Sequence, residues 1–221
     1  MPRLKPETQH ARREQILDAA ERCIARSGFH GATMADICAE AKLSPGALYG
    51  HFASKEALIA GIAERDRNKL AGEFKALADA PDLFQALQKL GEHYTIEEPR
   101  YKRVLCVEIG AEATRNAEVG AIFRSVDSFV LKSFEDLFAR AAETGRISPR
   151  YDPATLALLV NIIGEGLFWR RAIDPEFDPN SVMPAVMSVI EHLLNAVPQE
   201  VARPSCADEA AASPGDKDTN P

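Results

Sequence analysis

The chain has 221 residues, of which 46% are hydrophobic and 27% are charged, and its formal net charge is −7. This composition is typical of a globular protein and excludes a wholly disordered chain. No apolar run approaches the roughly 18 residues of a membrane-spanning helix, and no apolar signal-peptide core follows Met1, so we expect a cytoplasmic protein that engages no membrane.

The charges and the cysteines are distributed unevenly. Residues 1–60 carry eight basic and seven acidic side chains, whereas residues 61–221 carry 18 and 26. The cysteines are spaced too widely for a metal-binding pair or a disulfide framework: Cys23, Cys38, Cys106 and Cys206. We expect reduced structural thiols, no metal site and no cofactor.

Two short helices are predicted near the N-terminus. Apolar residues spaced along one face predict a helix over 7–27, which Gly28 should end. Thr33 and Asp36 have the spacing of a capping box, so a second helix should start there and run to about Ala41.

The next helix begins with strong local features. Ser44 is a good N-cap, and Pro45 occupies the first helical position, where its missing N–H costs nothing. This third helix should run to Phe52 with Gly50 inside it. Ser54 should then cap a fourth helix.

The rest of the chain up to residue 197 is also predicted to be helical. Amphipathic periods and Pro or Gly breaks place helices near 81–95, 101–115, 117–144, 153–173 and 179–196. No alternating strand pattern of useful length appears, so the expected fold class is all-α. The Pro-rich stretch 198–221, which has no aromatic residue, is predicted to be a disordered tail.

Helices two and three have the arrangement of a helix-turn-helix. Leu48 and Phe52 are four residues apart and should both face the core. The opposite face is small and uncharged: Pro45, Gly46, Ala47, Tyr49, Gly50 and His51. A helix with such a face can enter the major groove of DNA with its first residues against base edges.

Residues 15–62 resemble the DNA-binding domain of the TetR family of bacterial transcription repressors, above all in the run Leu48-Tyr49-x-His51-Phe52-x-x-Lys55. The resemblance implies a helix-turn-helix domain at 13–60 and a helical domain at 61–197 that binds a ligand and dimerises. Many members carry a basic residue where this chain has Pro45, so one phosphate or base contact should be lost here.

The resemblance also implies which residues meet an inverted-repeat operator in double-stranded DNA. The expected DNA-binding residues are Thr33, Ser44, Pro45, Gly46, Ala47, Tyr49, His51 and Lys55. Thr33, Ser44 and Lys55 should contact phosphates, whereas Gly46 and Ala47 should lie against base edges. The N-terminal arm 1–12, with Arg13 just beyond it, is either a further basic DNA contact or a frayed terminus.

The same resemblance implies a homodimer that a small-molecule effector releases from DNA. Candidate pocket residues of the second domain are Tyr94, Cys106, Glu108, Phe123, Phe129, Phe168, Trp169 and Arg170. We expect a small, largely apolar effector whose charge is selected by Glu108 or Arg170.

Two other classes stay open beside a ligand-responsive repressor. A DNA-binding dimer without small-molecule sensing would carry the same N-terminal motif. An enzyme would need a catalytic constellation, and the sequence lacks G-x-S-x-G, H-E-x-x-H and a phosphate-binding glycine loop. His93 and Cys106 could form a nucleophile pair, but a single Cys on an apolar helix is usually structural. We therefore predict that the chain is not an enzyme.

Overall fold

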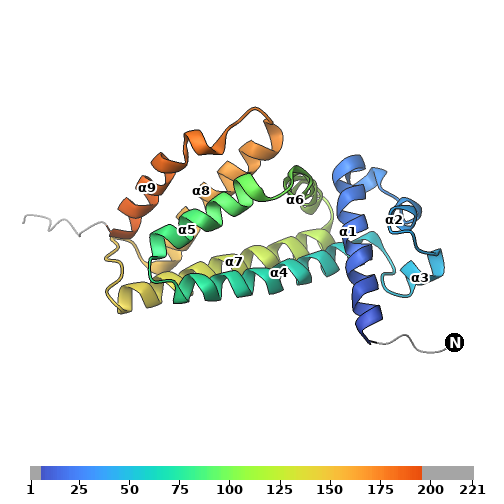
Figure 1. The fold of residues 1–221 in the computed structure, drawn as a ribbon, viewed down its shortest axis with the longest axis horizontal. Coiled ribbons are helices and arrows are strands. Elements are labelled where there is room, and N and C mark those ends of the chain that lie inside the picture. Colours follow the sequence, from blue (N-terminus) through green and yellow to red (C-terminus); the bar gives the residue numbers. More distant parts are fainter. Residues whose placement is uncertain (1–5, 196–221) are drawn as a thin grey trace, which may run out of the picture.

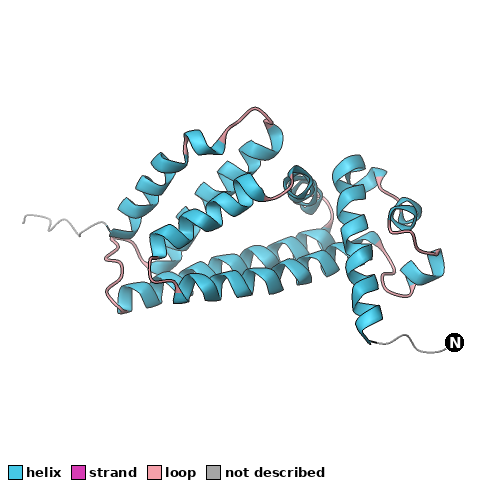
Figure 2. Cartoon of the chain, in the orientation of Figure 1, coloured by secondary structure: helices cyan, strands magenta, loops and turns pink. Residues whose placement is uncertain are grey.

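The computed structural model describes residues 6–195, and every regular element in that range is a helix (Figure 1, Figure 2). The expected all-α class is confirmed. The predicted disordered tail at 198–221 lies outside the described residues, as do the first five residues of the predicted N-terminal arm.

The N-terminal domain is built from α1 (Pro6–Gly31), α2 (Met34–Glu40), α3 (Pro45–Tyr49) and the start of α4 (Lys55–Asp79). Gly28 interrupts α1 with a φ of 74°, in the left-handed region that glycine adopts without a Cβ penalty. The predicted end at this glycine is therefore a kink, and the chain stays helical to Gly31.

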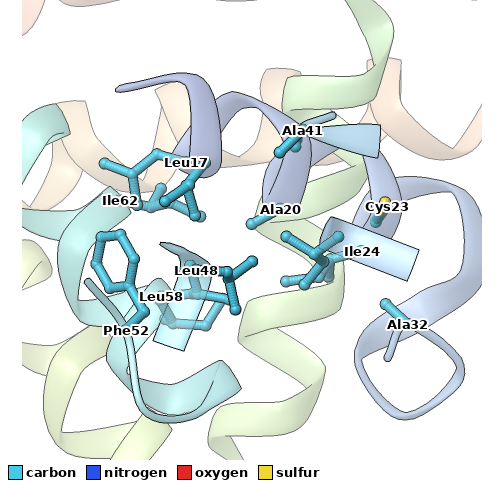
Figure 3. Close-up of a cluster of buried hydrophobic side chains, with 14 of the residues drawn as sticks. Leu17, Ala20, Cys23, Ile24, Ala32, Ala41, Leu48, Phe52, Leu58 and Ile62 are labelled. Carbon is cyan, nitrogen blue, oxygen red and sulfur yellow. The ribbon is translucent and has the colours of Figure 1, made fainter. Parts of the chain in front are cut away.

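A tight apolar core holds these helices together (Figure 3). Leu17, Ala20 and Ile24 project from α1 toward the side chains of the third and fourth helices. Leu48 and Phe52 are both buried in this core, which confirms the inward face predicted for the third helix.

The prediction that the third helix runs to Phe52 is wrong. The helix ends at Tyr49, and Gly50 is its C-cap rather than a residue of its interior, with an N–H that donates to Gly46 O at 3.1 Å. The N–H groups of His51 and Phe52 both donate to Leu48 O, and this last turn carries Phe52 into the core.

The second domain is a layered helical bundle. Its remaining elements are α5 (Leu83–Glu92), the π-helical turn η1 (His93–Glu97), α6 (Arg100–Ala113), α7 (Ala117–Glu143), α8 (Pro153–Ile173), the 3-10 turn η2 (Pro179–Ser181) and α9 (Met183–Asn195). The long helices α4 and α7 run side by side, α8 lies along α7, and α6 abuts α1 (Figure 1).

Two of the predicted helices are each divided in the structure. The helix expected at 81–95 ends as α5 and continues as the π-helical turn, and the helix expected at 179–196 is split into η2 and α9. Asp178 caps the short 3-10 turn through Asn180 N, at 3.0 Å. Pro184, which has no N–H to donate, then lies in the first turn of α9, where that loss costs nothing.

The two domains share a continuous seam. Leu105 of α6 and Val119 of α7 belong to the N-terminal core, although both lie far along the chain. Helix α4 also continues without a break past residue 60, where the sequence suggested a domain boundary. Helices α4 and α6 both contribute side chains to the core of the N-terminal domain, so a movement of either helix would displace that core.

Candidate DNA interface and effector domain

Local capping fixes the two helices of the helix-turn-helix. Thr33 Oγ1 accepts the N–H of Asp36 at 3.1 Å, and the carboxylate of Asp36 accepts the N–H of Thr33 at 3.0 Å. Ser44 Oγ accepts the N–H of Ala47 at 3.3 Å and so starts α3. Both caps confirm the sequence prediction.

The outward face of α3 is open and small. Pro45 and Gly46 are exposed, and a Cβ added to Gly46 would meet no atom within 4 Å. Tyr49 is the only large side chain of this helix that points outward, with 56% of its surface exposed, while Ala47 and His51 are half-buried. Tyr49 therefore adds one large side chain, with a hydroxyl that can donate or accept a hydrogen bond, to a face that is otherwise small and open.

The expected phosphate contacts are not equally available. The hydroxyl of Ser44 accepts its capping bond, so its own proton is free to be donated. The hydroxyl of Thr33 instead donates to Asp36 at 2.6 Å, and these bonds hold the pKa of Asp36 below its usual value. Lys55 Nζ donates to the carbonyl of Phe29 and lies 4.5 Å from the centre of that ring. The side chains of Thr33 and Lys55 therefore each already donate a hydrogen bond to another group of the same chain.

The turn between α2 and α3 carries a basic residue that is not among the expected DNA-binding residues. Lys42 is exposed between α2 and α3 and has a φ of 53°, which is uncommon for a residue with a Cβ. It lies two residues before the cap of α3 and is the only lysine or arginine between Arg26 and Lys55 in the sequence.

Most of the N-terminal arm lies in the helix predicted to start near residue 7. Residues 6–12 already belong to α1, so they form the first turns of a helix rather than a frayed segment. Arg13 forms an ion pair with Glu64 and lies 5.1 Å from the centre of the Phe52 ring. Its guanidinium is used to hold α1 against α4.

Three of the expected pocket residues are directed away from the interior of the second domain. Glu108 points to α1, because a Cβ added to Gly28 would lie 3.3 Å from its Oε2. Arg170 pairs with Asp174 at 3.5 Å, one turn along the chain. Trp169 is 51% exposed. The spacing of apolar residues predicts that this segment is a helix, but it does not show which side of α8 packs against the other helices.

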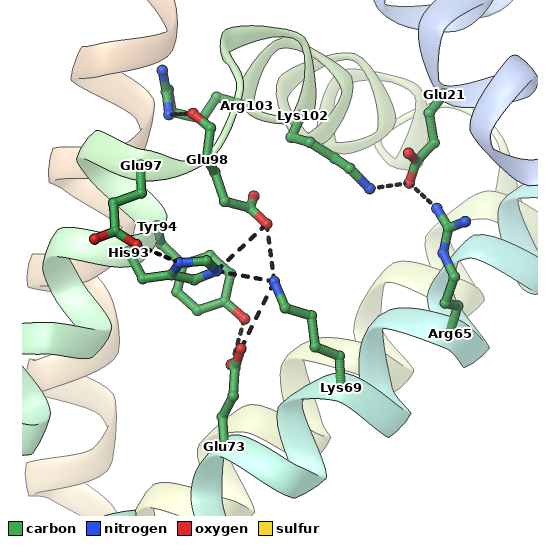
Figure 4. A network of polar contacts seen from close by, with 10 residues as sticks. All are labelled: Glu21, Arg65, Lys69, Glu73, His93, Tyr94, Glu97, Glu98, Lys102 and Arg103. Atoms are coloured by element: carbon green, nitrogen blue, oxygen red, sulfur yellow. Dashed lines mark hydrogen bonds and ion pairs between the residues drawn. The ribbon is translucent and has the colours of Figure 1, made fainter.

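Other expected pocket residues lie nearer the interior. Tyr94 belongs to a polar cluster between α4 and η1 and donates to Glu73 Oε2 at 2.6 Å (Figure 4). Lys69 Nζ lies 3.1 Å from both Glu98 Oε1 and His93 Nε2. Desolvation and the bond to Glu73 raise the pKa of the Tyr94 phenol above its ordinary value. A π-helical turn is frequently found at a functional site.

The remaining candidates lie on α6, α7 and α8. Cys106 is exposed as a residue, but the atoms packed around its thiol and the carboxylates of Asp66, Glu165 and Glu98 raise the pKa of the thiol to about 11. The thiol therefore stays protonated and is a poor nucleophile. Phe123 lies 3.8 Å from the position of a Cβ added to Gly110 of α6. Phe129 and Phe168 are half-buried, on α7 and α8.

The nucleophile pair is not formed. One ring nitrogen of His93 lies 3.0 Å from Glu97, and the other lies 3.1 Å from Lys69. Both nitrogens thus have partners other than Cys106.

A buried carboxylate joins the two domains. Glu21 of α1 is completely buried, and its Oε1 accepts bonds from Arg65 of α4 at 2.5 Å and from Lys102 of α6 at 2.6 Å (Figure 4). Burial acts to lower the pKa of Arg65, but the charge and the hydrogen bond of Glu21 raise it above its ordinary value. A second link joins His30 Nε2 to the buried carboxylate of Glu112 at 2.9 Å.

These features define a class of protein: a two-domain DNA-binding regulator with an N-terminal helix-turn-helix and a larger helical domain. The family model described as bacterial regulatory proteins, tetR family, matches residues 16–62. The HTH-type transcriptional regulator UidR of Escherichia coli (strain K12) is 32% identical over 160 residues, 72% of this chain and 81% of that protein. The chain therefore belongs to the TetR family of transcriptional regulators, which are not enzymes.

Solved structures agree with this assignment. Salmonella enterica GusR has a TM-score of 0.73 and 30% identity, covering 86% of this chain and 97% of that one. FadR from Bacillus subtilis in complex with stearoyl-CoA has a TM-score of 0.69 at 16% identity, over 82% and 99% of the two chains, and shares the fold. None of the helices between residues 6 and 195 is both long and apolar enough to cross a bilayer.

Proposed function

We propose that this protein is a repressor that binds an inverted-repeat operator as a homodimer and leaves it when a small-molecule effector binds. The outward face of α3, with Tyr49 exposed and Gly46 open, is the observation that supports DNA binding most directly. Such a protein would work in the cytoplasm, where the chromosome of its bacterial relatives lies.

An apolar stripe on α8 supports the dimer. Leu158, Ile162, Trp169 and Ile173 are exposed and separated by four, seven and four residues, so they lie on one face of the helix. Val189 of α9 is also exposed. Two copies of this surface related by a two-fold axis would bury it and would place two recognition helices on a two-fold symmetric operator.

The polar cluster of η1 supports an effector site in the second domain. Tyr94, His93 and Lys69 present hydrogen-bonding groups there, so the effector should carry polar groups as well as an apolar part. FadR shares this fold and holds stearoyl-CoA, so the architecture can accommodate a small molecule. A regulator that binds DNA but senses no small molecule is the alternative.

Replacing Tyr49 by Ala should weaken operator binding about tenfold or more, because a large exposed contact on the recognition helix is lost. Tyr151→Ala is the matched control, since Tyr151 is 44% exposed and lies between α7 and α8, outside the helix-turn-helix. Fluorescence anisotropy with a palindromic duplex measures both variants. Equal affinities would contradict the proposed interface.

Replacing Lys42 by Gly should separate stability from binding. Glycine accepts the left-handed conformation at this position, so the melting temperature should stay unchanged or rise slightly. If Lys42 contacts a phosphate, the operator affinity should fall. The slope of log affinity against log salt concentration should also become shallower by about one unit. An unchanged salt slope would exclude this residue from the interface.

Effector sensing is tested on the operator complex. Molecules retained by the purified protein are identified by mass spectrometry and added back to the complex with DNA. Release of the operator, with a higher half-release concentration in Tyr94→Phe than in the wild type, supports the proposal. Molecules that bind but leave operator affinity unchanged favour the alternative.

A further inference from the structure

A hollow lies on the seam between α1 and α6, and none of its lining residues belongs to the polar cluster of η1. Its volume is about 330 Å³, and it is lined by Arg22, Ala25 and Arg26 of α1 and by Arg100, Tyr101 and Val104 of α6. Three of these six side chains are arginines. They come from both domains.

Positive charge is in excess in this hollow. Arg22 Nε donates to Glu40 Oε1 at 2.9 Å, and Arg26 Nη1 donates to Glu40 Oε2 at 3.4 Å, so two guanidiniums share one carboxylate. Two further carboxylates influence these arginines. Asp18, which influences Arg22, is bonded to Arg65 at 2.8 Å, and Asp36, which influences Arg26, is bonded to Thr33 at 2.6 Å. Within residues 6–195, Arg100 has no ion pair or side-chain hydrogen bond, and the two Nη groups of Arg22 have none either.

The other walls indicate the shape of a ligand. Arg100 and Tyr101 begin α6, whose N-cap Pro99 provides no side-chain hydrogen bond, so the first N–H groups of this 14-residue helix add to the positive potential. Tyr101, Val104 and Ala25 form an apolar wall beside the guanidiniums.

We propose that this hollow binds a small organic anion, whose phosphate or carboxylate group is held by Arg22, Arg26 and Arg100 and whose apolar part lies against Tyr101. Guanidinium groups bind both kinds of anion through paired, charge-assisted hydrogen bonds. The bound molecule would touch α1 and α6 together and would tie the DNA-binding domain to the second domain. The site is separate from the effector site proposed above and does not depend on it.

Titration calorimetry on the full chain tests this site, with pyrophosphate, inorganic phosphate and citrate at constant ionic strength. We expect saturable binding of one anion per chain and a dissociation constant about tenfold higher in Arg100→Gln. Arg150→Gln, which removes an exposed arginine elsewhere, should bind like the wild type. Tighter binding of the two phosphates indicates a phosphorylated ligand, whereas tighter binding of citrate indicates a carboxylate.

Three results would overturn the proposal. One is the absence of saturable binding for all three anions, and another is an equal loss of binding in both arginine variants. The third is that Arg100→Gln leaves the anions unaffected and weakens only operator binding, which would make this surface a DNA contact.

Discussion

Replacing Glu21 by Gln should lower the free energy of unfolding by about 2–3 kcal/mol, because a fully buried carboxylate that accepts two charged hydrogen bonds is lost. The amide has nearly the same volume, so the loss is one of charge rather than of packing. In a chain of this length it corresponds to a fall in melting temperature of roughly 5–10 °C.

Glu14→Gln provides the matched control on the same helix. Glu14 also meets Arg65, at 3.3 Å, but its side chain is 34% exposed. An ion pair of this kind contributes less than about 1 kcal/mol. Denaturant unfolding of the two variants at one protein concentration gives the comparison. If both lose the same stability, Glu21 does not join the domains in the way the structure indicates.

The elements that the sequence predicted best are those with local causes. Thr33, Ser44 and Ser54 each accept an N–H three residues away, so the start of a helix is encoded within one turn. The core face of the third helix also follows from the spacing of Leu48 and Phe52. Such features need no knowledge of the rest of the fold.

Long-range pairing could not be predicted in this way. Glu21 reads as an ordinary polar residue of an amphipathic helix, and only the fold brings Lys102 to it from 81 positions away. Lys55 likewise reads as a phosphate contact, but its ammonium group meets the carbonyl of Phe29. Charged side chains have several possible partners, and the tertiary structure chooses among them.

The outer face of α8 shows the same limit for apolar residues. Leu159 and Ile163 are half-buried, and Ile163 packs against the hydrophobic cluster of the second domain. Leu158 and Ile162, one residue before each, are exposed instead. A helix that is apolar nearly all round does not reveal from its sequence which side meets its own bundle.

Replacing Ile162 by Glu should convert the proposed dimer into monomers. Ile162 is 53% exposed at the centre of the α8 stripe, so each chain tolerates the change, but a two-fold axis would bury two carboxylates in one interface. We expect the dimer to weaken by about 3 kcal/mol or more, which is above about 100-fold in its dissociation constant. Operator affinity should fall with it, since the two half-sites are no longer bound together.

Ala71→Glu is the control, because it places the same charge on an exposed position of α4, away from the stripe. Analytical ultracentrifugation at micromolar concentration should show monomers for the α8 variant and dimers for the wild type and the control. Circular dichroism of the monomers should keep the helical content of the wild type, because the stripe supports the assembly rather than the fold of one chain. A dimer that persists in Ile162→Glu would move the interface to another surface and leave the apolar stripe of α8 to a different partner.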